Sequence, residues 1–95
     1  MSTYRMRGLG LYDSHNRKIA TARGHAIFDA SNRQVAGIRG NDLFDLEQRI
    51  MMSVRGNDIY DADNAKVASL SEVGESIKGA PDGMLPVAMW YCFVR

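Results

Sequence analysis

The residues of this 95-residue chain whose type and spacing point most clearly to a chemical role are arginines. Four of them recur every sixteen residues, each directly before a glycine: Arg7, Arg23, Arg39 and Arg55. A guanidinium group donates forked hydrogen bonds that match a phosphate or a carboxylate. If the four side chains point toward a common axis, they would repel one another unless an anion lay among them, which predicts an axial anion site. The simpler interpretation, which we favour, pairs each arginine with an aspartate of its own or a neighbouring repeat, since the net charge of the chain nearly cancels.

The other residues of chemical interest suggest no catalytic arrangement. His15 and His25 each occur in a single repeat, and neither lies in a nucleophile motif. Cys92 lies in an apolar tail, where a thiol behaves as a small buried hydrophobe. The sequence contains no glycine-rich phosphate loop, dinucleotide fingerprint, zinc spacing or calcium loop. We therefore expect a protein that is not an enzyme and that uses neither a metal nor a cofactor.

The arginines belong to an internal repeat of sixteen residues. Three further columns are filled in all four copies: glycine at Gly8, Gly24, Gly40 and Gly56; an aromatic residue at Tyr12, Phe28, Phe44 and Tyr60; and aspartate at Asp13, Asp29, Asp45 and Asp61. The repeats cover about residues 7–22, 23–38, 39–54 and 55–71 of a single domain, 1–95. The pattern stops past Ser71, which leaves residues 72–95 as a C-terminal capping segment.

Each repeat predicts a β-hairpin, because an apolar and aromatic stretch is followed by polar residues and then by alternating residues. We expect the aspartate to cap amides in the loop, and Asn16, Asn32 and Asn64 to adopt a left-handed backbone there, with Gln48 as the weak copy. Gly40-Asn41 and Gly56-Asn57 have the form of type II′ turns between hairpins. The repeats thus predict an eight-strand meander.

Both faces of this meander carry apolar side chains, so both need cover. An open sheet would leave one face wet and two edges unpaired, which favours aggregation. We therefore predict an all-β fold in which four tandem hairpins close around a pseudo-four-fold axis. The aromatic column is expected to form the core of each hairpin, with a stacking platform for bases or sugars as the alternative.

The C-terminal segment reads as a cap on this array. Residues 71–80 have helical spacing, although Gly74 weakens the pattern. Pro86 could occupy the first turn of a helix running to Val94, while the aromatic and β-branched residues there also suit a strand; we favour the helix. This apolar segment is expected to cover one face of the array, and pairing with a second chain is the alternative.

Four units of the form Gly-x-x-apolar-aromatic-Asp, followed by a tail ending in residues 89–95, resemble the four-fold beta flower domain family. The resemblance covers nearly the whole chain. It implies a small bacterial domain of four hairpins arranged radially around an axis, and it carries no information about an activity or catalytic residues. The third copy departs most from the pattern, through the apolar residues Leu46 and Ile50 in its loop.

Composition and net charge argue against several classes of function. The net charge of +1 lacks the basic excess typical of nucleic-acid binding. A single cysteine excludes an intrachain disulfide, no apolar stretch follows the N-terminal charges, and the longest apolar run spans eleven residues (84–94), so we expect a cytoplasmic protein without a membrane span. We expect a non-enzymatic binding or protein-interaction module, self-associating through the tail or an apolar face. The alternative is a small-ligand domain that binds an anion or phosphate at an axial site formed by the repeated arginines.

Overall fold

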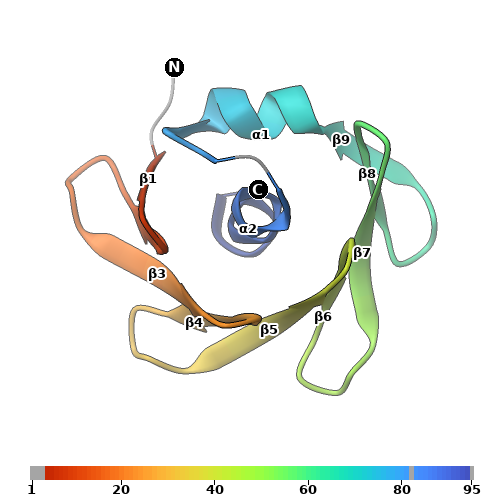
Figure 1. Cartoon of the computed structure of the whole chain (residues 1–95), viewed down its shortest axis with the longest axis horizontal. Coiled ribbons are helices and arrows are strands. Elements are labelled where there is room, and N and C mark those ends of the chain that lie inside the picture. Colours follow the sequence, from red (N-terminus) through yellow and green to blue (C-terminus); the bar gives the residue numbers. More distant parts are fainter. Residues whose placement is uncertain (1–3, 82, 95) are drawn as a thin grey trace.

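The computed structural model describes residues 4–81 and 83–94, which form one ten-stranded sheet and a short helical C-terminal region. The sheet curls around helix α2, and helix α1 spans the gap between its two ends (Figure 1). The strands are β1 (Tyr4–Arg7), β2 (Gly10–Tyr12), β3 (Lys18–Arg23), β4 (Ala26–Asp29), β5 (Gln34–Arg39), β6 (Asp42–Phe44), β7 (Ile50–Arg55), β8 (Asp58–Asp61), β9 (Lys66–Ser69) and β10 (Ile77–Lys78). The helices are α1 (Leu70–Ser76), α2 (Met84–Met89) and the π-helical η1 (Trp90–Val94).

The strand order follows the chain from β1 to β9, and each of these strands is antiparallel to the next. The predicted mostly-β fold is therefore confirmed, and the expected meander corresponds to β2–β9. Two strands were not predicted: β1 precedes the meander, and β10 pairs with it in parallel. The sheet is open, since β9 and β10 are its edges. Closure around a pseudo-four-fold axis stays a prediction.

Two-residue turns that begin with glycine connect the hairpins. The strand register places Arg39 opposite Asp42, which leaves only Gly40 and Asn41 in the turn. Gly40 has a φ of 58°, while Asn41 does not have a positive φ. A positive φ at the first turn position alone is the pattern of the type II′ turn, as predicted. The first turn positions of the four repeats all have this backbone, with φ between 58° and 61°, at Gly8, Gly24, Gly40 and Gly56.

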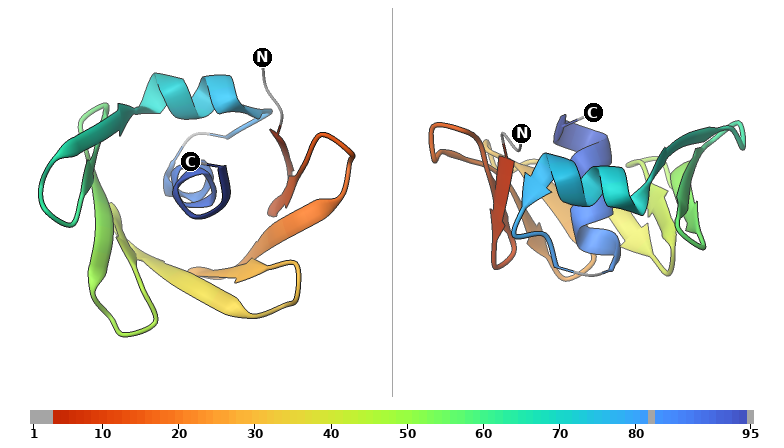
Figure 2. Two further views of the ribbon diagram at one scale, coloured as in Figure 1. Left: turned by 180° about the vertical axis from the view of Figure 1, so that it is seen from behind. Right: turned by 90° about the horizontal axis from the view of Figure 1, so that it is seen from above.

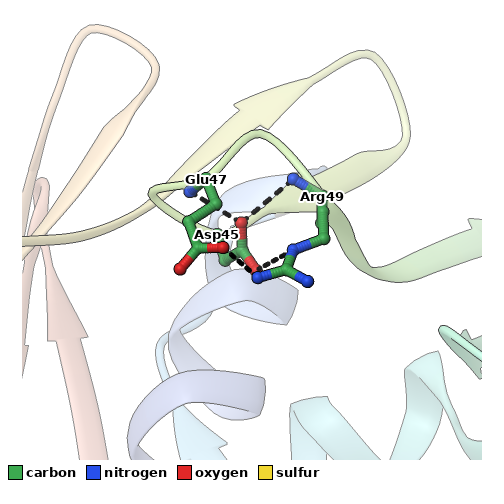
Figure 3. Close-up of polar contacts among 3 residues, drawn as sticks. All are labelled: Asp45, Glu47 and Arg49. Atoms are coloured by element: carbon green, nitrogen blue, oxygen red, sulfur yellow. Dashed lines mark hydrogen bonds and ion pairs between the residues drawn. The ribbon is translucent and has the colours of Figure 1, made fainter.

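The longer loops are organised by the aspartate column. In the third repeat, Oδ1 of Asp45 accepts hydrogen bonds from the backbone N–H groups of Glu47 and Arg49, at 2.8 and 3.0 Å (Figure 3). The Arg49 guanidinium also pairs with the carboxylates of Asp45 and Glu47. The same two backbone bonds recur in the other three loops. The prediction that this aspartate caps loop amides is confirmed.

The left-handed residue of each loop is also where the sequence predicted it. The φ angles are 63°, 66° and 68° at the three asparagines, Asn16, Asn32 and Asn64. Gln48 adopts the same backbone with φ of 67°, although glutamine tolerates this region less well than asparagine. The third loop thus keeps the repeat geometry despite its divergent residues.

The hydrophobic core lies between the inner face of the curled sheet and α2, which stands inside the curl (Figure 2). The apolar residues that precede the aromatic column are fully buried: Leu11, Ile27, Leu43 and Ile59. Small side chains at Ala20 and Ala36 leave room for the helix, whose Ala88 and Met89 are also fully buried. The tail therefore covers an apolar face, as predicted, and it does so from inside the curl.

The C-terminal region differs from its prediction at one point. The expected helix over 71–80 ends at Ser76, and Ile77 and Lys78 form β10 instead. The backbone of β10 pairs with the free edge of β1, which a continuing helix could not do. The second predicted helix, which runs to Val94, is confirmed: Pro86 lies in the first turn of α2, and the π-helical η1 continues the helix to Val94. No helix among the described residues is long and apolar enough to cross a membrane.

Candidate functional site

The four repeated arginines form a regular series, which we call the arginine ladder: Arg7, Arg23, Arg39 and Arg55. Each is the last residue of a strand and directly precedes a glycine turn. Its guanidinium lies over the aromatic ring on the following strand. The distances from Cζ to the ring centroid are 5.3 Å to Tyr12, 4.2 Å to Phe28, 4.6 Å to Phe44 and 4.0 Å to Tyr60. All four lie within cation–π range.

The ladder lies on the outer face of the sheet. Side chains alternate between the faces of a strand, and Leu43, beside Phe44, is fully buried against the inner face. Phe44 therefore points outward and is half-buried under Arg39, which is exposed. The expectation that the aromatic column forms the hairpin core was wrong: the preceding apolar residue fills the core, and the ring supports an arginine.

An amide side chain fixes each guanidinium from a second direction. Arg39 Nη2 donates to Oε1 of Gln48 at 2.7 Å, and Arg23 Nη2 donates to Oδ1 of Asn32 at 2.5 Å. Arg7 and Arg55 donate in the same way to Asn16 and Asn64. The left-handed loop residue therefore has two roles, since it turns the backbone and accepts from the arginine nine residues earlier.

The expected pairing of these arginines with aspartates does not occur. Within residues 4–81 and 83–94 the ion pairs are Arg49 with Asp45 and with Glu47, and Lys66 with Asp58. The loop aspartates are instead engaged by backbone amides, and those bonds lower the pKa of Asp13 and Asp45 below their usual value. No ladder arginine is neutralised by a carboxylate among these residues, so most of its five N–H donors stay available.

The structure does not bring the four ladder arginines together. Each is held over a ring of its own hairpin on the outer face, while α2 occupies the inside of the curl (Figure 1). The observed arrangement is therefore a spaced series of cations and differs from the axial cluster that the anion hypothesis requires.

Three hollows open beside ladder positions. One of about 290 Å³ is lined by Arg39, Gln48 and His25, among others, and one of about 510 Å³ is lined by the residues sixteen later, Arg55, Asn64 and Asn41. A third, of about 310 Å³, lies against β1 and β10 and is lined by Arg7 and Asn16 at the corresponding positions. Residues sixteen and thirty-two positions apart therefore line hollows of a similar kind.

The three hollows differ in the charge of the paired strand residues that line them. In the first hollow, small residues face each other, Ala26 opposite Gly37. In the second, Asp42 lies opposite Ser53, whose hydroxyl donates to the carboxylate at 2.7 Å. In the third, Lys78 of β10 lies opposite Arg5 of β1, so that two cations are neighbours.

The other residues considered for chemistry are not assembled into a site. The described part of the chain has no group of three or more His, Cys, Asp or Glu that could hold a metal. Cys92 is half-buried in η1, and burial raises the pKa of its thiol to about 11. Such a thiol is protonated at neutral pH and is a poor nucleophile.

Sequence reasoning missed the arginine–ring–amide contact, although the signal was present. The ring follows each ladder arginine by five residues and the amide follows it by nine in every copy, as at Arg39, Phe44 and Gln48. Residues that recur with the same offsets are candidates for contact in each repeat. Arg5 and Lys78 left no such signal, since their pairing depends on β10.

The comparisons with known proteins gave no further assignment: no family model, curated protein or solved structure matches the chain.

Proposed function

We propose that this protein is a non-enzymatic interaction module that binds an acidic segment of a partner protein along the arginine ladder. The observation that carries the proposal is the state of the ladder: four guanidiniums held in place by rings and amides, exposed, and without carboxylate partners in the described chain. Preorganised guanidiniums lose little side-chain entropy when they bind carboxylates in a forked geometry.

Carboxylates suit this surface better than nucleic acid does. Bases bind proteins by stacking on open aromatic faces, and here a guanidinium covers each ring of the column, as Arg55 covers Tyr60. The chain also has a net charge of only +1, which gives little counterion release. Asp42 lies beside Arg39 on the same face, where its charge would repel a continuous phosphate backbone, whereas Asp58 is paired with Lys66.

The test uses a fluorescein-labelled oligoglutamate peptide, with binding followed by fluorescence anisotropy at low and high salt. A triple variant, Arg23→Lys, Arg39→Lys and Arg55→Lys, keeps the charge and removes the fork, so its affinity should fall several-fold. The matched control replaces the loop arginines with lysine, one for each of the first three loops: Arg17, Arg33 and Arg49. Equal affinities of the two triple variants would refute the proposal, as would tighter binding of a single-stranded oligonucleotide than of the peptide.

Self-association is a second proposal, and the third loop supports it. Leu46 and Ile50 are 57% and 45% exposed, and both lie at that loop, whereas the tail residues Val87–Trp90 are used in the core of this chain. Light scattering of the wild type and of Leu46→Ser tests it. A concentration-dependent dimer that Leu46→Ser abolishes would support it, and a monomer at all concentrations would overturn it.

We also propose that the four hairpins are repeats arranged about α2, as the resemblance to the four-fold beta flower family implies. The recurrence of the turn, loop and ring contacts every sixteen residues supports this arrangement. Circular dichroism and NMR of a chain that keeps residues 1–6 and the natural tail, with four identical copies of repeat 23–38 between them, would test it. Failure of that chain to fold would contradict equivalent repeats.

A further inference from the structure

We propose that the hollow between β10, β1 and the first loop is a binding site for a phosphate group carried by a small molecule. Its cationic side chains are Arg5, Arg7 and Lys78, and its volume is about 310 Å³. This volume lies at the small end of ligand pockets, which suits a phosphate on a compact body.

The placement of two of these cations is unfavourable without a ligand. Arg5 and Lys78 occupy directly paired positions of β1 and β10, and both are exposed on the outer face. Like charges at paired positions destabilise a sheet. Neither side chain has a carboxylate partner or a hydrogen bond among residues 4–81 and 83–94. An anion between them would remove the repulsion.

Comparison with the other repeats shows that Arg5 is an exception to the pattern. The positions that correspond to it sixteen, thirty-two, forty-eight and sixty-four residues later all carry small residues: Thr21, Gly37, Ser53 and Ser69. Their paired positions on the neighbouring strand hold glycine, alanine or aspartate. Two facing cations therefore occur at this one edge of the array within the described chain, so the charge is not a consequence of the repeat.

The lining of the hollow is cationic overall, with three cations against one carboxylate. That carboxylate is Asp13, whose negative charge opposes an anion, but its Oδ1 is already engaged by the backbone N–H groups of His15 and Arg17, at 2.9 and 3.0 Å. Arg7 is oriented by Tyr12 and Asn16 and keeps further donors free. Three cations suit a phosphate dianion better than they suit a single carboxylate, because the phosphate has two charges and at least three acceptor oxygens.

Isothermal titration calorimetry with inorganic phosphate at pH 7.5, and with acetate at matched ionic strength, tests the proposal. We expect saturable phosphate binding and at least about tenfold weaker acetate binding. Arg5→Ser introduces the small residue that two other repeats have here. It should weaken phosphate binding at least about tenfold, which is the loss of one charge-assisted hydrogen bond. Arg33→Ser, an equal change of charge in the second loop, should bind phosphate like the wild type.

Stability separates a ligand site from a structural role of Arg5. Without phosphate, Arg5→Ser should unfold at the same temperature as the wild type or higher, because it removes a like-charge contact. A lower unfolding temperature would mean that Arg5 stabilises the fold, and it would overturn the proposal. So would the absence of saturable phosphate binding to the wild type, or an equal loss in Arg33→Ser. The two tests can be told apart although Arg7 belongs to both sites: the ladder triple variant leaves Arg5, Arg7 and Lys78 unchanged, and Arg5→Ser leaves all four ladder arginines unchanged.

Discussion

Replacing either of two glycines near the end of the sheet with alanine should change the stability of the protein, in opposite directions at the two positions. Gly79 has a φ of +75°, and a Cβ built there would lie 3.1 Å from the backbone oxygen of Met6. The left-handed backbone alone costs an alanine about 1–2 kcal/mol. The contact adds to this cost, because the Met6 carbonyl belongs to β1 and cannot move without disturbing the strand. Gly79→Ala should therefore lower the free energy of unfolding by at least about 1–2 kcal/mol.

Gly74 provides the matched control. It lies inside α1, and a Cβ there would meet nothing within 4 Å. Alanine is the better helix former by about 0.5–1 kcal/mol, so Gly74→Ala should stabilise the protein by that amount. For a domain of this size, 1 kcal/mol shifts the unfolding temperature by about 4–8 °C. The two variants should then differ clearly in a thermal melt.

Thermal and urea unfolding of both variants, followed by circular dichroism, measure these changes. A Gly79→Ala protein as stable as the wild type would refute the reasoning, because it would mean that the turn after β10 relaxes without strain. Equal destabilisation of both variants would also refute it, since the structure makes their environments different.

Three further predictions concern the repeats and the tail. Hydrogen bonds from the backbone N–H groups of Arg49 and Glu47 lower the pKa of Asp45 below 3.8, so this carboxylate contributes stability above about pH 4 that is lost as the pH falls through its folded-state pKa; Asp45→Asn should therefore unfold with a shallower pH dependence below pH 4 in urea titrations. Gln48→Asn should raise the free energy of unfolding by about 0.5–1 kcal/mol, because asparagine tolerates a φ of 67° better and keeps the amide that Arg39 requires. Burial raises the pKa of Cys92 from 9.0 to about 11, so its thiolate fraction at pH 8 falls about a hundredfold, and iodoacetamide should label it far more slowly in the folded chain than in urea.

A specific experimental result would contradict each of these three predictions. An unchanged acid transition in Asp45→Asn would mean that the loop amides find other partners. Destabilisation by Gln48→Asn would show that side-chain length matters more than backbone conformation at that site. Labelling of Cys92 at equal rates in the folded and unfolded chains would show that η1 opens readily.

The predictable features of the fold are local ones. The type II′ turn depends on Gly40 and its neighbours, and the loop geometry depends on Asp45 accepting two nearby amides. Such interactions depend on residues within a few positions of one another, so the residue types that make them recur at the same spacing in every copy. The helix of residues 71–80 was predicted too long for the opposite reason: Ile77 leaves the helix to pair with Tyr4, more than seventy residues away.

The candidate site was predicted in part. The ladder arginines were identified from their spacing, while their partners and their direction were not. Alternation separates the two faces of a strand, but both faces here carry apolar side chains, so it does not say which one is inside. The packing of Ala88 and Met89 against the inner face decides this, and it turns Phe44 and Arg39 outward.

The sequence by itself determined the sixteen-residue period, the hairpins, their turns and the capping aspartates, because each depends on contacts between residues close in the chain. The tertiary structure alone decided three things: which face the C-terminal helix covers, that the ladder arginines lie over rings, and that Arg5 meets Lys78. These depend on the packing of the tail into the curl and on a parallel pairing between distant segments. A repeat pattern encodes neither, since the tail is not part of the repeat.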